Sequence, residues 1–147
     1  MVLGAVRRRM SDAPGRRRVV VVGSSHETRA LAARLADEFD VTFVSDRRDV
    51  LAGARAEGVD ARHDTLDRES ELPSWDLAAD AAVVATDRDK TNMLVAQQLK
   101  TLRGVRDIVV RVNDPDREGA FAGLDVATVC GSDTLTPQVS ATLEEAI

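Results

Sequence analysis

The sequence predicts an α/β fold with a doubly wound, mostly parallel sheet of six strands and helices on both faces. Short apolar runs rich in β-branched residues, such as the valines at 19–22, are typical of strands that are buried on both faces. These runs alternate with segments of helical apolar spacing along all 147 residues. Such alternation predicts right-handed crossovers between parallel strands and a ligand site at the carboxyl edge of the sheet.

Residues that start or stop regular structure bound each expected element. Gly23 ends the first valine run, Gly58 and Gly104 end helices, Asp87 is a natural N-cap, and Pro115 suits a first helical turn. The expected strands are residues 19–22, 41–46, 59–62, 81–85, 107–112 and 126–130. The expected helices follow Gly23 to about residue 35 and then span 47–57, 87–102, about 116–122 and about 137–146, with a short irregular helix across 66–77.

A basic leader precedes a single acidic domain. Residues 1–18 hold six arginines and one acid, a net charge of +5, so the total of −5 leaves −10 for residues 19–147. We expect residues 1–17 to be a disordered leader and residues 18–147 to form one domain that ends in a helix. An acidic body argues against nucleic-acid binding, which needs a basic face.

Cysteine and histidine usage, together with hydropathy, narrows the class of protein further. The single cysteine, Cys130, excludes an internal disulfide, as in a reducing cytoplasm. Two isolated histidines without cysteine companions leave no ligand set for zinc, so we expect no metal. No apolar run reaches the length that crosses a bilayer. A cytoplasmic protein is expected, and peripheral contact with the inner face of the membrane is compatible with it.

The first strand, helix and second strand resemble a dinucleotide-binding unit. Gly23 ends the first strand, and Asp46 ends the second strand 23 residues later, where a carboxylate accepts hydrogen bonds from ribose hydroxyls. Ser24, Ser25 and His26 stand at the helix start, where phosphate is bound. A carboxylate at position 46 favours NAD or adenosine nucleotides over NADP, but a guanidinium beside it, from Arg47 or Arg48, is able to reverse that preference.

The glycine motif of this unit is altered. Laid on G-x-G-x-x-G, only Gly23 is retained, because Ser25 and Thr28 occupy the second and third glycine positions. Glu27 stands near the helix N-terminus, where it repels an anion. Two interpretations stay open: an altered loop that still binds nucleotide, and a scaffold that has lost its ligand.

Several phrases of the sequence resemble one family in order and spacing. The most specific are A-T-D-x-D-x-x-N, from Ala85 to Asn92, and R-V-N-D-P, from Arg111 to Pro115. With the first strand and "GVDARHDTLD", they are similar to the TrkA-N domain, also called the N-terminal domain of RCK (regulator of conductance of potassium) proteins. The likeness covers about residues 18–136.

The resemblance implies a Rossmann-type domain that binds NAD(H), ATP, ADP or AMP, forms homodimers or rings, and gates a membrane cation transporter or channel subunit. It also implies ligand contacts from residues beyond the glycine loop and Asp46. Asp64 and Thr65 match a phrase near the adenine, although His63 replaces its glycine. The remaining implied contacts follow the fourth and fifth strands: Thr86, Asn92 and Arg111.

Two of these residues have competing structural roles. Asn92 is a polar residue among apolar neighbours and needs a partner, which is either ligand or loop backbone. Arg111 closes a buried strand and needs an anion, which is either ligand phosphate or an internal carboxylate, Asp64 or Asp114.

Enzyme functions are less favoured than regulation. A nicotinamide dehydrogenase lacks its chemistry here, because the chain has no tyrosine and is too short for a substrate domain. A phospho-receiver would use Asp64, Thr86 and Arg111, but the first strand ends in Gly23 and serines instead of an acidic pair for magnesium. We therefore expect a non-catalytic regulatory subunit. Its dimer contact is expected on the apolar face of the last helix: Val139, Leu143 and Ile147.

Overall fold

The computed structural model describes residues 15–66 and 78–147. Most of the basic leader and most of the expected irregular helix at 66–77 lie outside these residues. The described strands form one parallel sheet in the order β3-β2-β1-β4-β5-β6, which confirms a Rossmann-type fold. The strands are β1 (Arg18–Gly23), β2 (Asp40–Ser45), β3 (Asp60–His63), β4 (Ala81–Ala85), β5 (Asp107–Val112) and β6 (Ala127–Cys130).

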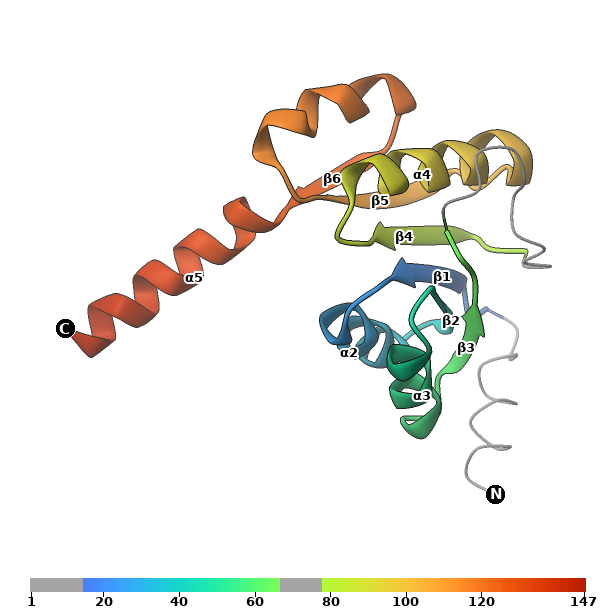
Figure 1. Ribbon diagram of the computed structural model, residues 1–147, viewed down its shortest axis with the longest axis horizontal. Helices are drawn as coiled ribbons and strands as arrows, with labels where there is room; N and C mark the ends of the chain where they lie inside the picture. Colours follow the sequence, from blue (N-terminus) through green and yellow to red (C-terminus); the bar gives the residue numbers. More distant parts are fainter. Residues whose placement is uncertain (1–14, 67–77) are drawn as a thin grey trace.

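Helices cover both faces of this sheet, as Figure 1 shows. Helices α2 (His26–Leu35) and α3 (Arg48–Ala56) pack on one face, while α4 (Asp89–Arg103) and the 3₁₀ helix η1 (Pro115–Leu124) pack on the other. The valines of β1 alternate between two hydrophobic clusters: Val19 and Val21 face α2 and α3, and Val20 and Val22 face α4. The valine run is therefore buried on both sides of the sheet, as its composition predicts.

Several expected element boundaries differ from the structure. Strand β3 lies one residue later than expected. Helix α4 begins at Asp89 with Arg88 as its N-cap, because the Thr86 hydroxyl accepts the Arg88 N–H at 3.3 Å and Asp87 makes no cap. The last helix, α5 (Gly131–Ala146), starts six residues before the expected position. Pro137, where the expected helix begins, lies inside α5.

Helix α5 projects away from the sheet (Figure 1), and none of its side chains is buried against the described residues. Large apolar side chains recur at every fourth position along α5 and its C-cap: Leu135, Val139, Leu143 and Ile147 are 63%, 45%, 54% and 97% exposed. Val109 of β5 and Val129 of β6 are also exposed, at 36% and 45%. No helix in the described part of the chain has the length and hydropathy needed to cross a membrane.

Candidate functional site

The predicted site residues gather where the strands end. Gly23 ends β1, Asp46 follows β2, Asp64 follows β3, Thr86 follows β4, and Arg111 lies one residue before the end of β5. Because all the strands are parallel, these carboxyl ends form one edge of the sheet. The turns that leave this edge position the side chains discussed below.

A capping box closes the turn between β1 and α2. The Thr28 N–H donates to the Ser25 hydroxyl at 3.2 Å, and the Ser25 N–H donates to the Thr28 hydroxyl at 3.1 Å. Thr28 is 2% exposed and packs beside Gly23, where a Cβ would lie 2.5 Å from the Thr28 Cβ. Packing thus requires Gly23, and a buried side chain fills the position of the third glycine.

The capping box still leaves donors at the start of α2. The first N–H groups of a helix have no intrahelical acceptor, and the box satisfies those of Ser25 and Thr28. The N–H groups of His26 and Glu27 belong to the same turn and are not part of the box. Beside them, the side chain of Ser24 is half-buried. Two backbone donors and one hydroxyl therefore remain for a phosphate at this turn.

The turn after β2 presents a carboxylate to solvent. Asp46 is exposed, and within the described residues its carboxylate has no hydrogen bond or ion pair. Arg47 turns to Asp49 instead, with a 3.1 Å hydrogen bond. Desolvation raises the pKa of Asp49, but the charge of Arg47 and the hydrogen bonds from Arg47 and from backbone N–H groups together outweigh it and lower the pKa. His26 extends this group, because its Nε2 lies 3.7 Å from Asp49 and its Nδ1 accepts a hydrogen bond from Arg29 at 3.2 Å.

The turn after β3 uses its aspartate to shape the backbone. The Asp64 carboxylate accepts the Leu66 N–H at 2.9 Å, and Leu66 has a positive φ of 63°. The Asp64 N–H donates to the Ser45 carbonyl at 3.0 Å, which ties this turn to β2. Thr65, between them, is exposed. One oxygen of Asp64 therefore has a structural role, while Thr65 is accessible to a ligand.

Asn92 links the ends of β4 and β5 by hydrogen bonds. It is completely buried; its side-chain amide donates to the carbonyls of Thr86 at 3.1 Å and Arg111 at 3.0 Å, and its oxygen accepts the Thr86 N–H at 2.9 Å. The Thr86 hydroxyl also donates to this oxygen. The sequence leaves two partners open for the Asn92 side chain, a ligand and loop backbone. In the structure this side chain bonds to backbone groups.

Asp89 is a structural residue that sequence reasoning missed. It is 8% exposed and accepts the N–H groups of Asn113 at 2.7 Å and Asp114 at 2.9 Å, along with the Asn113 side-chain amide at 3.0 Å. Burial raises the pKa of Asp89, but these hydrogen bonds outweigh it and lower the pKa below its ordinary value. A signal was available, because Asp89 belongs to one family phrase and Asn113 to the other. The two phrases bind each other across the turns that follow β4 and β5.

Arg111 has an internal partner that differs from the two expected carboxylates. Its Nη1 donates to Glu27 Oε1 at 2.7 Å, across 84 residues of sequence. The expected internal partner, Asp64 or Asp114, was wrong. The partner is Glu27, because the start of α2 lies next to the end of β5. The guanidinium also lies beside the start of α5, 3.5 Å from where a Cβ of Gly131 would be. Arg111 thus contacts Glu27 at the start of α2 and lies close to Gly131, the first residue of α5.

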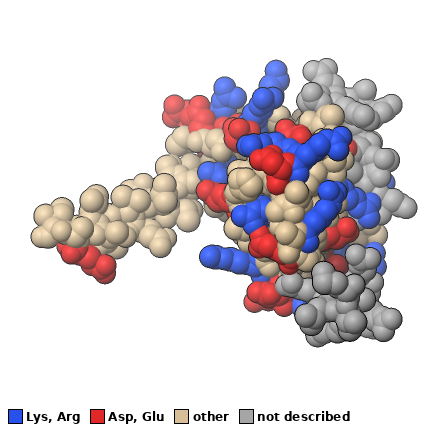
Figure 2. All heavy atoms as spheres, turned by 60° about the horizontal axis from the view of Figure 1, so that its bottom comes forward, with Lys and Arg blue, Asp and Glu red and all other residues tan. Residues whose placement is uncertain are grey.

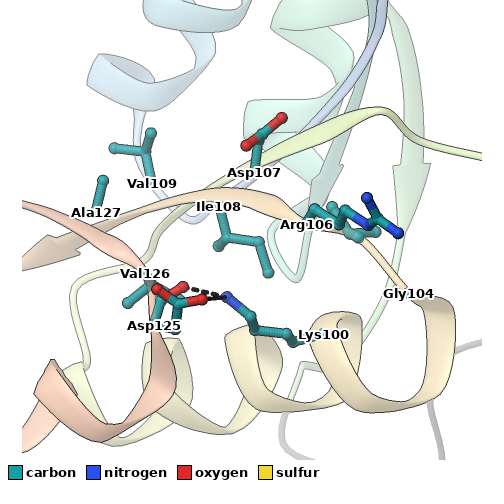
Figure 3. A pocket seen from close by; sticks show the side chains of 10 residues that line it. Lys100, Gly104, Arg106, Asp107, Ile108, Val109, Asp125, Val126 and Ala127 are labelled. Carbon is teal, nitrogen blue, oxygen red and sulfur yellow. Dashed lines mark hydrogen bonds and ion pairs between the residues drawn. The ribbon is translucent and has the colours of Figure 1, made fainter.

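A hollow lies at the opposite edge of the sheet, near the amino ends of β5 and β6 (Figure 3). Lys100 and Asp125 form an ion pair at 3.5 Å across one side of it. None of the predicted site residues lines this hollow. Ligands of doubly wound sheets bind at the carboxyl edge, so the residues described above remain the candidate site.

Comparison with known families now adds to this geometry. The sequence profile of the TrkA-N domain matches residues 19–132. This chain belongs to the TrkA-N family. The match begins in β1 and ends at the start of α5, so it includes every strand of the TrkA-N sheet. A search among curated protein sequences finds no match.

Solved structures share the fold of this TrkA-N domain. The TrkA-N domain of inner membrane protein ybaL from Escherichia coli has a TM-score of 0.71 and 13% identity, over 89% of this chain and 99% of that one. The NAD(P)-binding domain of an exopolyphosphatase-related protein from Archaeoglobus fulgidus has a TM-score of 0.66 and 22% identity, over 88% and 99%. A xanthine dehydrogenase from Bacillus halodurans has a TM-score of 0.54 and 11% identity, over 80% and 36%. At such identities the likeness establishes the fold alone.

The arrangement has the parts needed to hold a nucleotide. The N–H groups at the start of α2 are donors for phosphate, and Asp46 is an acceptor for ribose hydroxyls. Among residues 15–66 and 78–147, no three or more His, Cys, Asp or Glu side chains form a group that could hold a metal ion.

Proposed function

We propose that this TrkA-N chain is a regulatory, non-catalytic subunit that binds NAD(H) or an adenine nucleotide and controls a potassium or other cation transporter from the cytoplasm. The main supporting observation is the exposed carboxylate of Asp46 just after β2, which has no partner in the described part of the chain and lies at the same sheet edge as the N–H groups of His26 and Glu27. Those groups match the ribose and phosphate contacts of a Rossmann-type site. Family membership supports the transport role, and ybaL, which contains a TrkA-N domain, is itself an inner membrane protein.

A regulatory role requires that ligand binding change how the chain contacts another molecule. Helix α5 offers such a contact, because its apolar stripe has no partner among the described residues. Arg111, which is paired with Glu27 at the proposed phosphate-binding turn, lies close to Gly131 at the start of this helix. We infer that a second copy covers this stripe in a homodimer. Ligand binding then shifts the population of the ways in which two protomers pack.

Charged substitutions in α5 test the dimer. Leu143→Asp places a carboxylate on the stripe, while Ala141→Asp places the same charge on the opposite side, since neighbouring helical residues differ by about 100°. Sedimentation velocity is expected to give a monomer for Leu143→Asp and a dimer for the wild type and Ala141→Asp. A wild-type monomer at all concentrations would refute this contact.

Thermal unfolding with added nucleotide tests the proposed ligand. A ligand at about 100 times its dissociation constant stabilises the folded state by about 2.7 kcal/mol. NADH, NAD, ATP, ADP and AMP are each added at millimolar concentration, and at least one is expected to raise the melting temperature by several degrees. Asp46→Asn is expected to reduce that rise.

A second candidate, a dimerising scaffold without ligand, is favoured by Thr28, which fills the position of the third glycine. The same unfolding experiment distinguishes the two functions. If no nucleotide shifts the melting temperature while the chain still forms a dimer, the scaffold is the better account.

A further inference from the structure

The ion pair between Glu27 and Arg111 places a carboxylate where a phosphate-binding site needs a cation. Glu27 is the second residue of α2 and donates one of the N–H groups that remain for phosphate. Its carboxylate forms an ion pair with the guanidinium of Arg111 near the end of β5, with 2.7 Å between Oε1 and Nη1. The Glu27 side chain is 76% exposed and that of Arg111 is 34% exposed, so a bound ligand would meet both charges.

Arg47, which follows Asp46, is also paired with a carboxylate. Its guanidinium lies 3.1 Å from Asp49. Asp46 itself has no cation among the described residues. Asp46, Arg47 and Arg111 thus contribute two paired guanidinium groups and one carboxylate without a cation in the described part of the chain. Such a site tolerates a ligand of low charge and disfavours one of high charge.

We propose that Glu27 makes this site selective for a dinucleotide such as NAD(H) over a nucleoside triphosphate. This inference rests on the proposed nucleotide site. The diphosphate of NAD(H) has about two negative charges and ATP without magnesium about four. Glu27 repels these charges and offsets the attraction that the paired Arg111 exerts on them. At about 7 Å in water-like surroundings, each additional charge weakens binding by about threefold. Two additional charges would weaken it by up to about tenfold.

The test compares ligand selectivity in matched variants. Dissociation constants for NADH and for ATP without magnesium are measured by calorimetry for the wild type, Glu27→Gln and Glu38→Gln. Glutamine keeps the size of the side chain and still accepts a hydrogen bond from Arg111. Glu38 lies in the turn after α2 and is exposed, so Glu38→Gln removes the same charge away from the site.

The wild type is expected to bind NADH more tightly than ATP. Glu27→Gln is expected to gain about three- to tenfold more affinity for ATP than for NADH, and Glu38→Gln is expected to leave the ratio unchanged. High salt shortens the range of the repulsion, so the wild-type preference should shrink at about 1 M salt without any mutation.

Two outcomes overturn the inference and have different consequences for the proposed function. If the wild type binds nucleotide but Glu27→Gln leaves the ATP-to-NADH ratio unchanged, the site is real and Glu27 does not select its ligand. If neither the wild type nor Glu27→Gln binds either nucleotide, the proposed nucleotide site fails and the selectivity fails with it. If Glu27→Gln binds ATP and the wild type does not, the result supports the inference.

Discussion

Replacing Asn92 with alanine tests whether the most buried of the predicted ligand residues is structural. The substitution leaves the Thr86 N–H without its acceptor and removes one donor from the Arg111 carbonyl. An unsatisfied buried N–H costs about 1–3 kcal/mol, and a lost hydrogen bond about 1 kcal/mol. The Thr86 carbonyl keeps a donor, the Asn113 side chain at 3.0 Å. We expect the free energy of unfolding to fall by about 3 kcal/mol.

Urea unfolding followed by circular dichroism measures this loss. With an m-value of about 2 kcal/mol per molar, the midpoint should fall by about 1.5 M. Gln97→Ala is the matched control, because it removes an exposed amide from the same helix and should change stability by less than about 0.5 kcal/mol. A loss for Asn92→Ala no larger than for Gln97→Ala would refute the structural role and return Asn92 to the list of ligand contacts.

Three further substitutions test the site. Asp46→Asn should weaken NADH binding about tenfold or more in calorimetry, because hydrogen bonds to a charged acceptor are worth about 1.5–3 kcal/mol, whereas Asp49→Asn should change it little. Because the folded-state pKa of Asp89 is lowered, its stabilisation is complete above the ordinary aspartate pKa and is lost as pH falls through the folded value; Asp89→Asn should flatten that acid loss in urea titrations. Gly23→Ala should lower the free energy of unfolding, because the new Cβ overlaps Thr28. The φ of Gly23 is not positive, so backbone strain does not add to this loss. Adding Thr28→Gly should restore part of the loss in a double-mutant cycle.

The sheet could be predicted from the sequence because its signals are local. The run of four valines in β1 is by itself typical of a strand that is buried on both faces, and it is so buried in the structure. Gly104 is likewise typical of a helix end, and it ends α4 with a positive φ of 67°. The start of α5 could not be predicted in the same way. Proline is typical of a first helical turn, but α5 already begins at Gly131, six residues before Pro137. Residues 131–136 have weak helix propensity, so the sequence does not indicate this earlier start.

The site was predicted less completely, because its contacts join distant segments. The need of Arg111 for an anion follows from its apolar surroundings, but the choice among carboxylates depends on how α2 lies against β5. Glu27 was recognised as repelling phosphate, without its partner. Asn92 was recognised as needing a partner, and the geometry of the turn after β4 decides that this partner is backbone.

The phrases most specific to the TrkA-N family are largely structural in this chain. Asp89 and Asn92 of the first phrase hold the backbone and side chain of the second, through Arg111, Asn113 and Asp114. Such a framework fixes the shape of the sheet edge without contributing a free charge to it. We therefore expect the ligand preference of the proposed site to depend on side chains that this framework does not use: Asp46, Glu27 and the guanidinium of Arg111. Substitutions at these positions are expected to change the ligand and keep the fold, so the selectivity of Glu27→Gln tests the proposed function more directly than the family match does.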